Sequence, residues 1–335
     1  MNKGRFVNAL VDDRWIGSHG IGRFAKEVIS RIGPYVPVRK NISLLSIWEP
    51  YQLSREISNT KASVYFSPGY NPPLTSDIPV VFTIHDLIHL KFSGENGILK
   101  RIYYEMIVKP AILKSFKVLT VSHFSKYEIM SWAGVGSEKV VVVGNGVDQQ
   151  YTPVGDIYSP GYPYFLNVGN HKPHKNIKRI IKAFIGSSIP SQVRLILTGT
   201  PDKNLREVIK KYRAEERVVF CAHIEEKLLP AYYRGAIGLL FPSLYEGFGL
   251  PIVEAMACGT PVITSNITSM PEVAGEAALL VDPHDCDDIR MAIERVFWDK
   301  DLCESLVVKG MRRAKDFSWE ETASQVMMVL RMAIQ

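Results

Sequence analysis

Short runs of β-branched and other apolar residues alternate along the chain with longer segments whose apolar positions recur every three to four residues. The short runs predict strands, and the longer segments predict amphipathic helices. The strands are expected at 6–11, 63–66, 80–84, 118–121, 140–143, 164–168, 193–198, 218–220, 238–241, 262–264 and 278–281. The helices of the first half include 21–32 and 99–114. This alternation is typical of α/β proteins with parallel sheets.

The strands and helices form two series of similar size, which predict two doubly wound domains, 1–150 and 151–317. Between the series, residues 144–163 are rich in Gly and Pro and have no helical or strand periodicity, so they are expected to form a linker. Near the end of the chain, Ser318 and Glu321 have capping-box spacing and predict a last helix.

The composition is that of a globular protein, with 335 residues, 46% hydrophobic and 22% charged. It excludes disordered, collagen-like and disulfide-scaffold proteins. No apolar window is long enough to span a membrane, and Asp12 and Asp13 interrupt any signal-peptide core, so a cytoplasmic protein is expected. The four cysteines are widely spaced, which fits free thiols better than a zinc site or disulfides.

The net charge of +6 lies entirely in the first half of the chain. Residues 1–150 hold 18 Lys and Arg against 12 Asp and Glu, whereas residues 151–335 hold 22 of each. The excess points to an anionic partner such as a phosphate-bearing substrate or a lipid surface, and a scatter of solubilising lysines explains it equally well. Because the basic residues form no compact stripe, nucleic acid is not an expected partner.

The segment 240–265, LFPSLYEGFGLPIVEAMACGTPVITS, carries the most chemical information. A strand is expected to end at Pro242, a Gly-rich turn follows, and a helix begins near Pro251, so free backbone N–H groups can hold a phosphate there. Glu246 and Glu254 lie eight positions apart around this helix start. Ionised carboxylates accept hydrogen bonds from sugar hydroxyls. Either acid alone is explained by a surface position or by the helix dipole, but the pair in this turn favours a ligand site.

This segment resembles the E-x(7)-E signature of the retaining GT-B glycosyltransferases of family 4. The matching residues are Glu246, Gly247, Phe248, Gly249, Leu250, Pro251, Glu254, Ala255, Gly259, Pro261 and Val262. The resemblance implies two Rossmann-like domains that face an interdomain cleft, with a C-terminal helix, 318–335, joined to the first domain. It also implies that Glu246 contacts the transferred sugar, that Glu254 contacts the donor ribose, and that the residues between them bind the donor.

The segment 164–184 carries a second part of the resemblance. A strand ends at Gly169, and Lys175 stands where the family places a basic residue against the donor pyrophosphate. The family usually has Arg directly after this glycine, whereas this chain has Asn170. Either Lys172 replaces the missing charge, or Lys175 and the backbone hold the phosphate alone. The donor nucleobase is expected near 220–224, with Ile224 in contact.

In the first half, His85 follows a predicted strand, at the end where open α/β sheets bind ligands, and the resemblance assigns it to the donor sugar. His89 stands four positions later, but no third ligand is recognisable, so a metal pair is not expected and His89 is interpreted as structural. Gly20 and Gly22 lie in a G-x-G-x-x-A pattern, and the resemblance assigns this loop to the donor phosphates and the acceptor site. Arg23 is equally well explained as an anion contact or as a helix residue.

Several other motifs do not indicate a ligand or metal site. Ser122 and Ser125 in 121–129 are explained by helix capping. The acids of 285–288 imitate the D-x-D metal motif of the other glycosyltransferase fold, but an N-cap explains them better. No P-loop pattern occurs, which disfavours a kinase or an ATPase. The segment 36–46 lacks the acid that an NAD site needs at the end of its strand, which disfavours a dehydrogenase.

The sequence therefore predicts a retaining hexosyltransferase that uses a nucleoside-diphosphate sugar, first GDP-mannose and alternatively a UDP-sugar, without a metal or other cofactor. The resemblance to bacterial mannosyl- and rhamnosyltransferases implies a lipid-linked glycan acceptor in O-antigen or capsule synthesis. The basic first domain suggests peripheral association with the anionic inner face of the cell membrane. A nucleotide-sugar 2-epimerase and a non-catalytic nucleotide-binding subunit remain as alternatives.

Overall fold

The computed structural model describes residues 7–92, 97–222 and 224–335. The chain divides into two compact units, each treated separately below. Unit 1 comprises Met1–Gly146 and Ser318–Gln335, and unit 2 comprises Val147–Phe317. The C-terminal segment thus belongs to the same unit as the N-terminal half of the chain.

The sheet of unit 1 has six parallel strands in the order β2-β1-β3-β4-β5-β6. The strands are β1 Ala9–Val11, β2 Val36–Pro37, β3 Val64–Ser67, β4 Val80–Thr83, β5 Lys117–Thr120 and β6 Val140–Val142. The pattern predicts all of them except β2. This strand escapes prediction because it has only two residues, both exposed at the sheet edge, and one of them is a proline.

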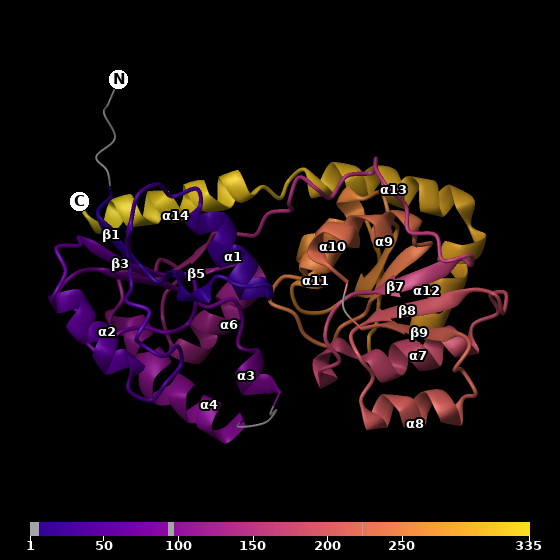
Figure 1. Cartoon of the computed structure of the whole chain (residues 1–335), viewed down its shortest axis with the longest axis horizontal. Coiled ribbons are helices and arrows are strands. Elements are labelled where there is room, and N and C mark those ends of the chain that lie inside the picture. Colours follow the sequence, from indigo (N-terminus) through magenta and orange to yellow (C-terminus); the bar gives the residue numbers. More distant parts are fainter. Residues whose placement is uncertain (1–6, 93–96, 223) are drawn as a thin grey trace. The chain divides into compact units, whose positions relative to one another are not determined.

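The helices of unit 1 are α1 Gly20–Ile29, α2 Glu49–Ser58, α3 Ile88–Lys91, α4 Gly97–Tyr103, α5 Lys109–Lys114, α6 His123–Ala133 and α14 Trp319–Ala333 (Figure 1). A short 3-10 turn, Asp13–Trp15, follows β1. The single helix predicted over 99–114 is wrong in one respect, because a π turn, Tyr104–Val108, separates α4 from α5. Pro110, which has no N–H to donate, lies in the first turn of α5, directly after this break.

Alternate residues of the unit 1 strands face opposite sides of the sheet. Leu10, Tyr65 and Phe82 belong to a core that also contains buried side chains of α2, α5 and α6. On the opposite side α14 contacts β3 and α1, and the rings of Phe24 and Trp319 meet with centroids 6.4 Å apart. Helices therefore cover both faces of this sheet, as Figure 1 shows for unit 1.

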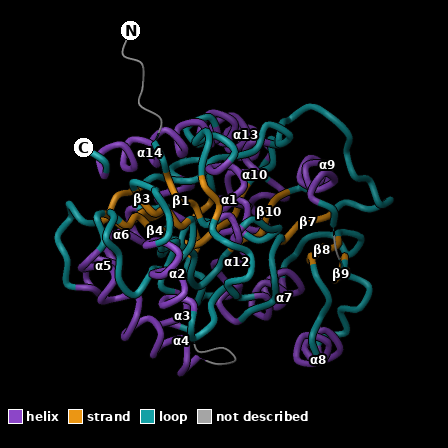
Figure 2. Tube along the Cα trace, turned by 60° about the vertical axis from the view of Figure 1, so that its left-hand side comes forward, coloured by secondary structure: helices purple, strands orange, loops and turns teal. Residues whose placement is uncertain are grey.

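Unit 2 also contains a sheet of six parallel strands, in the order β12-β11-β10-β7-β8-β9. The strands are β7 Tyr164–Asn167, β8 Arg194–Thr198, β9 Val218–Cys221, β10 Gly238–Phe241, β11 Val262–Ser265 and β12 Leu279–Val281. All six were predicted, with ends that differ by one residue at most. Figure 2 shows the strands of this unit with helices around them.

The helices of unit 2 are α7 Ile177–Gly186, α8 Lys203–Lys211, α9 Leu229–Gly235, α10 Leu250–Ala257, α11 Met270–Ala274, α12 Cys286–Trp298 and α13 Lys300–Ala314. Two 3-10 turns, Pro173–Lys175 and Glu226–Leu228, precede α7 and α9. The strand order reverses between β7 and β10 in unit 2 and between β1 and β3 in unit 1. Open α/β sheets bind ligands at the carboxyl ends of the strands beside such a reversal.

The predicted helix caps are confirmed. Ser122 accepts a hydrogen bond from the N–H of Ser125 at 3.0 Å, and Ser318 accepts one from Glu321 at 3.2 Å. Asp285 accepts from the N–H of Asp287 at 2.8 Å, so the acids of 285–288 begin a helix. All four cysteines are free thiols. Among the described residues, no helix combines the length and the apolar character that crossing a membrane requires.

Candidate active site

The loop that follows β10 carries Glu246 to the start of α10. Gly249 caps this helix with a φ of +100°, a conformation that favours glycine. A Cβ atom at this position would lie 3.0 Å from Cδ1 of Ile252. Pro251 lies in the first turn, and Gly259 follows the helix with a φ of +74°. The predicted start and end of the helix are thus confirmed.

Ser269 holds the Gly-rich loop in place from a distant part of the chain. Its hydroxyl, fully buried, is within hydrogen-bond distance of the carbonyl oxygens of Glu246 at 2.9 Å and Phe248 at 3.1 Å. The Phe248 ring packs edge-on against Phe317, with centroids 5.5 Å apart. The backbone of residues 246–248 is therefore fixed from two sides. Ser269 was not predicted from the sequence, because no local pattern marks it.

Lys175 and Glu246 form an ion pair, with Nζ and Oε1 2.7 Å apart. Their side chains retain only 14% and 12% exposure. The Lys175 ammonium also lies over the ring of Phe241, 4.9 Å from its centroid. These residues follow β7 and β10, the two strands beside the reversal of strand order. The structure thus brings together two residues that the sequence assigned to phosphate and to sugar.

Asn176 holds the segment that carries Lys175. It has a φ of +62°, which asparagine tolerates better than most residues, and it begins α7. Its buried side-chain amide donates to the carbonyl oxygens of Pro242 at 2.9 Å and Pro283 at 2.8 Å. These bonds join the loops that follow β7, β10 and β12. The sequence placed a helix start here but missed this function of the side chain.

Of the other predicted donor-binding residues of unit 2, Gly169 lies beside Lys175, because a Cβ atom added to this glycine would be 3.6 Å from Cε of Lys175. Gly169 has a φ of +148°, and its N–H donates to the Thr198 hydroxyl at 2.9 Å. Lys172 is exposed and lines a groove that residues of α7 and α8 also line. Of the predicted nucleobase segment, Phe220 lies in β9 and Ile224 follows position 223, which is outside the described residues.

Glu254 lies in α10, only 4% exposed. Its Oε2 accepts a hydrogen bond from the hydroxyl of Tyr233 at 2.8 Å. Burial, followed by the charge of Glu254, raises the pKa of Tyr233, so the phenol remains a proton donor at neutral pH. Tyr233 therefore orients the carboxylate. Tyr233 was not predicted from the sequence, since it lies 21 positions before its partner.

In unit 1, His85 follows β4 and lies against the loop after β3. Its Nε2 is 2.9 Å from the carbonyl oxygen of Pro68, which can only accept, so Nε2 carries the proton and Nδ1 is left as an acceptor. Burial lowers the pKa of His85 to about 4, and the imidazole is neutral at physiological pH. His89 lies in α3, and its ring is near those of Tyr70 and Tyr104, with centroids 5.8 and 6.0 Å away. The aromatic surroundings agree with a structural role for His89.

The two glycines in the first turn of α1, Gly20 and Gly22, differ in how closely other atoms approach them. A Cβ atom on Gly22 would lie 2.5 Å from the carbonyl oxygen of Gly17, whereas one on Gly20 would meet nothing within 4 Å. His19, which the sequence analysis missed, caps the helix by accepting the N–H of Gly22 at Nδ1, 3.1 Å away. Gly22 is therefore required for the packing of this loop, and Gly20 is not.

Alanine at these two positions is expected to have opposite effects on stability. Gly22→Ala should destabilise the protein by about 1–3 kcal/mol, because backbone atoms must move to admit the methyl group. Gly20→Ala should be neutral or slightly stabilising, since alanine is the better helix residue. Thermal unfolding of both variants measures the difference. Equal melting temperatures would contradict the steric argument, and a loss of activity in Gly20→Ala alone would place a ligand at this loop.

A network of buried polar side chains joins the carboxyl ends of β1 and β3. Asp12 and Glu49 are fully buried, and Arg14 pairs with both, at 2.5 Å and 2.6 Å. Asn71, also fully buried, donates to Asp12 Oδ2 at 2.6 Å and to Glu49 Oε1 at 2.8 Å. Its Oδ1 accepts from Trp15 at 2.7 Å. Asn71 is thus the centre of the network.

The network fixes the loop after β3, which contains Pro68, the hydrogen-bond partner of His85. Ser67 donates to Asn71 Oδ1 at 2.6 Å and accepts from the N–H of Gly69 at 3.1 Å, next to Pro68. Burial raises the pKa of Glu49, against the opposing effects of Asn71 and Arg14. No local motif of the sequence predicts this network, because Asp12, Glu49 and Asn71 lie far apart along the chain.

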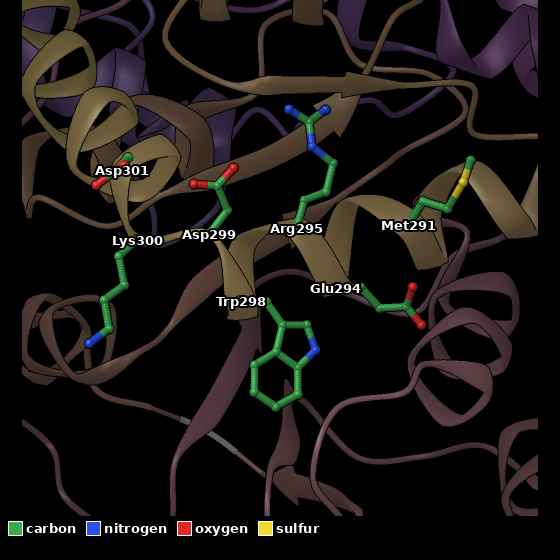
Figure 3. A pocket seen from close by; sticks show the side chains of 7 residues that line it. All are labelled: Met291, Glu294, Arg295, Trp298, Asp299, Lys300 and Asp301. Carbon is green, nitrogen blue, oxygen red and sulfur yellow. The ribbon is translucent and has the colours of Figure 1, made fainter.

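A hollow on unit 2 lies where α12 ends and α13 begins (Figure 3). It is lined by Met291, Glu294, Arg295, Trp298, Asp299, Lys300 and Asp301. Two of its acids already have partners, since Asp299 caps α13 and Glu294 accepts the N–H of Ser188 at 2.7 Å. It contains none of the predicted site residues.

Comparison with known proteins identifies the family. Residues 14–151 match the model of Glycosyltransferase Family 4, and residues 158–313 match that of Glycosyl transferases group 1. The O-antigen chain mannosyltransferase B of Escherichia coli is 30% identical over 298 residues, which cover 85% of this chain and 78% of that protein. The chain belongs to glycosyltransferase family 4.

This family 4 glycosyltransferase is also similar to the O-antigen chain mannosyltransferase RfbU of Salmonella typhimurium, with 33% identity over 64% of this chain and 60% of that protein. Among solved structures, sucrose-phosphate synthase from Thermosynechococcus elongatus gives a TM-score of 0.78 at 21% identity, covering 97% of this chain and 98% of that one. Anabaena HepE, in complex with UDP and glucose, gives 0.76 at 17% identity and covers 97% and 100%. The predicted fold, GT-B with two doubly wound domains, is confirmed.

Proposed function

We propose that this glycosyltransferase moves a hexose from a nucleoside-diphosphate sugar to a hydroxyl of a glycan acceptor, with retention at the anomeric carbon. The observation that carries the proposal is the Lys175–Glu246 pair, at the carboxyl ends of β7 and β10, with Glu254 on the helix that follows. An ammonium suits a diphosphate, and carboxylates suit sugar hydroxyls.

In this proposal the donor diphosphate binds Lys175 and the N-terminal end of α10, and the ribose binds Glu254. When the diphosphate binds, the Lys175 ammonium donates hydrogen bonds to the phosphate as well as to Glu246. The Glu246 carboxylate can then accept hydrogen bonds from the hexose hydroxyls. His85 accepts a hydrogen bond from a sugar hydroxyl through Nδ1. Catalysis then rests on positioning and on electrostatic stabilisation of the departing diphosphate, without a protein nucleophile.

The donor proposed first is GDP-mannose, with the acceptor a lipid-linked glycan of bacterial surface polysaccharide. The support is the similarity to two proteins named O-antigen chain mannosyltransferases. A UDP-sugar is the alternative donor, and the complex of HepE with UDP supports it. We further propose that the enzyme needs no metal or other cofactor and works at the inner face of the cell membrane.

A thermal-shift panel with GDP, UDP, ADP, CMP and NAD tests the donor assignment. A nucleotide at about 100 times its Kd stabilises the protein by about 2.7 kcal/mol, which raises the melting temperature by several degrees. GDP is expected to give the largest shift, with or without a chelator. A shift with UDP alone would change the donor, and no shift with any diphosphate would contradict the proposal.

The stereochemistry and the reaction type need a second measurement. With the donor identified, the anomeric configuration of the product is read by NMR, and retention is expected. Turnover of the donor sugar to its 2-epimer in the absence of an acceptor would instead indicate an epimerase. A dependence of turnover on added divalent metal would contradict the metal-free proposal.

A further inference from the structure

One helical segment of unit 1, residues 97–114, is apolar on two faces. It comprises α4, the π turn and α5. Its inner face packs into the core through Tyr104, Val108 and Ile112, which are at most 1% exposed. Its outer face exposes large apolar side chains, between 52% and 78% accessible: Ile98, Leu99, Ile102, Met106 and Leu113. Because surface helices usually present polar residues outward, this second apolar face calls for a partner.

The same segment concentrates positive charge. Lys100, Arg101, Lys109 and Lys114 stand against one acid, Glu105, which gives 97–114 a net charge of +3, half the +6 of the whole chain. Lys109 pairs with Glu105 at 3.8 Å. The other three cations are exposed and form no ion pair with another described residue. The charge is therefore available to an anionic partner.

A groove continues the apolar face toward β4. Its lining includes Met106, Pro110 and Lys114 of the helical segment and Pro72, Pro73 and Leu74 of the loop before β4. Leu74 is itself half exposed. In the ribbon of Figure 1 and in the tube of Figure 2, α4 lies at the outer edge of unit 1. The exposed apolar surface is thus wider than one helix.

We propose that the outer face of 97–114 docks on an anionic lipid bilayer. Ile98, Leu99 and Ile102 enter the interfacial region, and Lys100, Arg101 and Lys114 contact anionic headgroups. Exposed apolar residues interleaved with exposed cations that pair with no acid in the described part of the chain match this surface. A second copy of the chain does not, because two faces of like charge repel each other. The inference rests on the proposed function in one respect, since a lipid-linked acceptor gives the enzyme a reason to be at a membrane.

Vesicle sedimentation with the full chain tests this docking. The protein is expected to bind vesicles of phosphatidylcholine with phosphatidylglycerol, to bind pure phosphatidylcholine weakly, and to be released by salt. Lys100→Gln combined with Arg101→Gln should weaken binding about 25-fold, since each cation near an anionic surface contributes about fivefold. Ile98→Ser, Leu99→Ser and Ile102→Ser together should weaken it at least about tenfold without unfolding, because these side chains are exposed.

Matched controls come from unit 2. Lys210→Gln with Lys211→Gln removes two neighbouring exposed cations from α8, and Val154→Ser with Ile157→Ser and Val308→Ser removes three exposed apolar side chains. Both control variants should bind vesicles as the wild type does. All variants should keep the nucleotide-induced thermal shift of the wild type. If the wild type itself shows no such shift, the proposed function is contradicted, but the vesicle binding can still be interpreted.

Three results would overturn the docking proposal. The first is equal binding to neutral and anionic vesicles. The second is unchanged binding of both patch variants. The third is a dimer, seen by sedimentation velocity without lipid, that the apolar patch variant abolishes, because the occupant of this face would then be a second copy of the chain.

Discussion

Glu246→Gln is expected to lower kcat for sugar transfer on the order of 10²-fold, with donor affinity nearly unchanged. The amide keeps the size of the side chain and can still accept a hydrogen bond from Lys175, 2.7 Å away in the native pair. It removes the negative charge that the proposal assigns to the reacting hexose. Because Lys175 then no longer shares its charge with a carboxylate, its attraction for the diphosphate should not weaken. Initial-rate kinetics and nucleotide titration separate the two effects.

The matched control for this variant is Glu276→Gln, which removes the same charge from a side chain of unit 2 that is 94% exposed. It should leave kcat unaltered. The converse variant, Lys175→Gln, should weaken nucleotide binding more than it slows turnover of bound donor. A fully active Glu246→Gln enzyme would remove this residue from the reaction centre.

Asn71→Asp is expected to destabilise unit 1 by about 3–5 kcal/mol, a large part of the stability of an ordinary domain. The substitution is nearly isosteric, but it replaces the two N–H donors that satisfy Asp12 and Glu49 with a third buried carboxylate. Arg14 then has to compensate three negative charges. The melting temperature of the unit should fall by roughly 10 °C, as calorimetry would measure.

The comparison variant is Asn59→Asp, which makes the same chemical change at an exposed position where the side chain donates to the carbonyl oxygen of Arg55. It should change the melting temperature by no more than a degree or two. If Asn71→Asp has the same melting temperature as Asn59→Asp, the buried network contributes far less to stability than its geometry indicates.

The sequence predicts both ends of β10, Gly238–Phe241, correctly, because every residue of this strand is buried and a continuous apolar run marks it. The π turn at Tyr104–Val108 could not be predicted, since the apolar spacing of 99–114 fits an uninterrupted helix. In the candidate site, Glu246, Glu254 and Lys175 are visible because they lie close to glycines that mark a turn or a strand end.

The residues that hold those side chains in place were not predicted, and the reason is their separation along the chain. Ser269 binds the backbone of a residue 23 positions earlier, and Asn71 binds Asp12 across 59 positions. A motif records only neighbours within a turn or a helix. A lone serine or asparagine has no such neighbours, so its partner becomes visible only when the sheet has brought the two segments together.

Because α14 belongs to unit 1, the two units can fold in a different order from the one in which they are synthesised. Trp319, Val326 and Leu330 of this helix are at most 1% exposed, so unit 1 lacks part of its core until the ribosome has passed them. The residues of unit 2 come between the two segments of unit 1 in the sequence, and they end at Phe317. Domains usually finish folding from the N-terminus onward during synthesis. Here unit 2 can finish folding first, because unit 1 cannot complete its core before α14 has been synthesised.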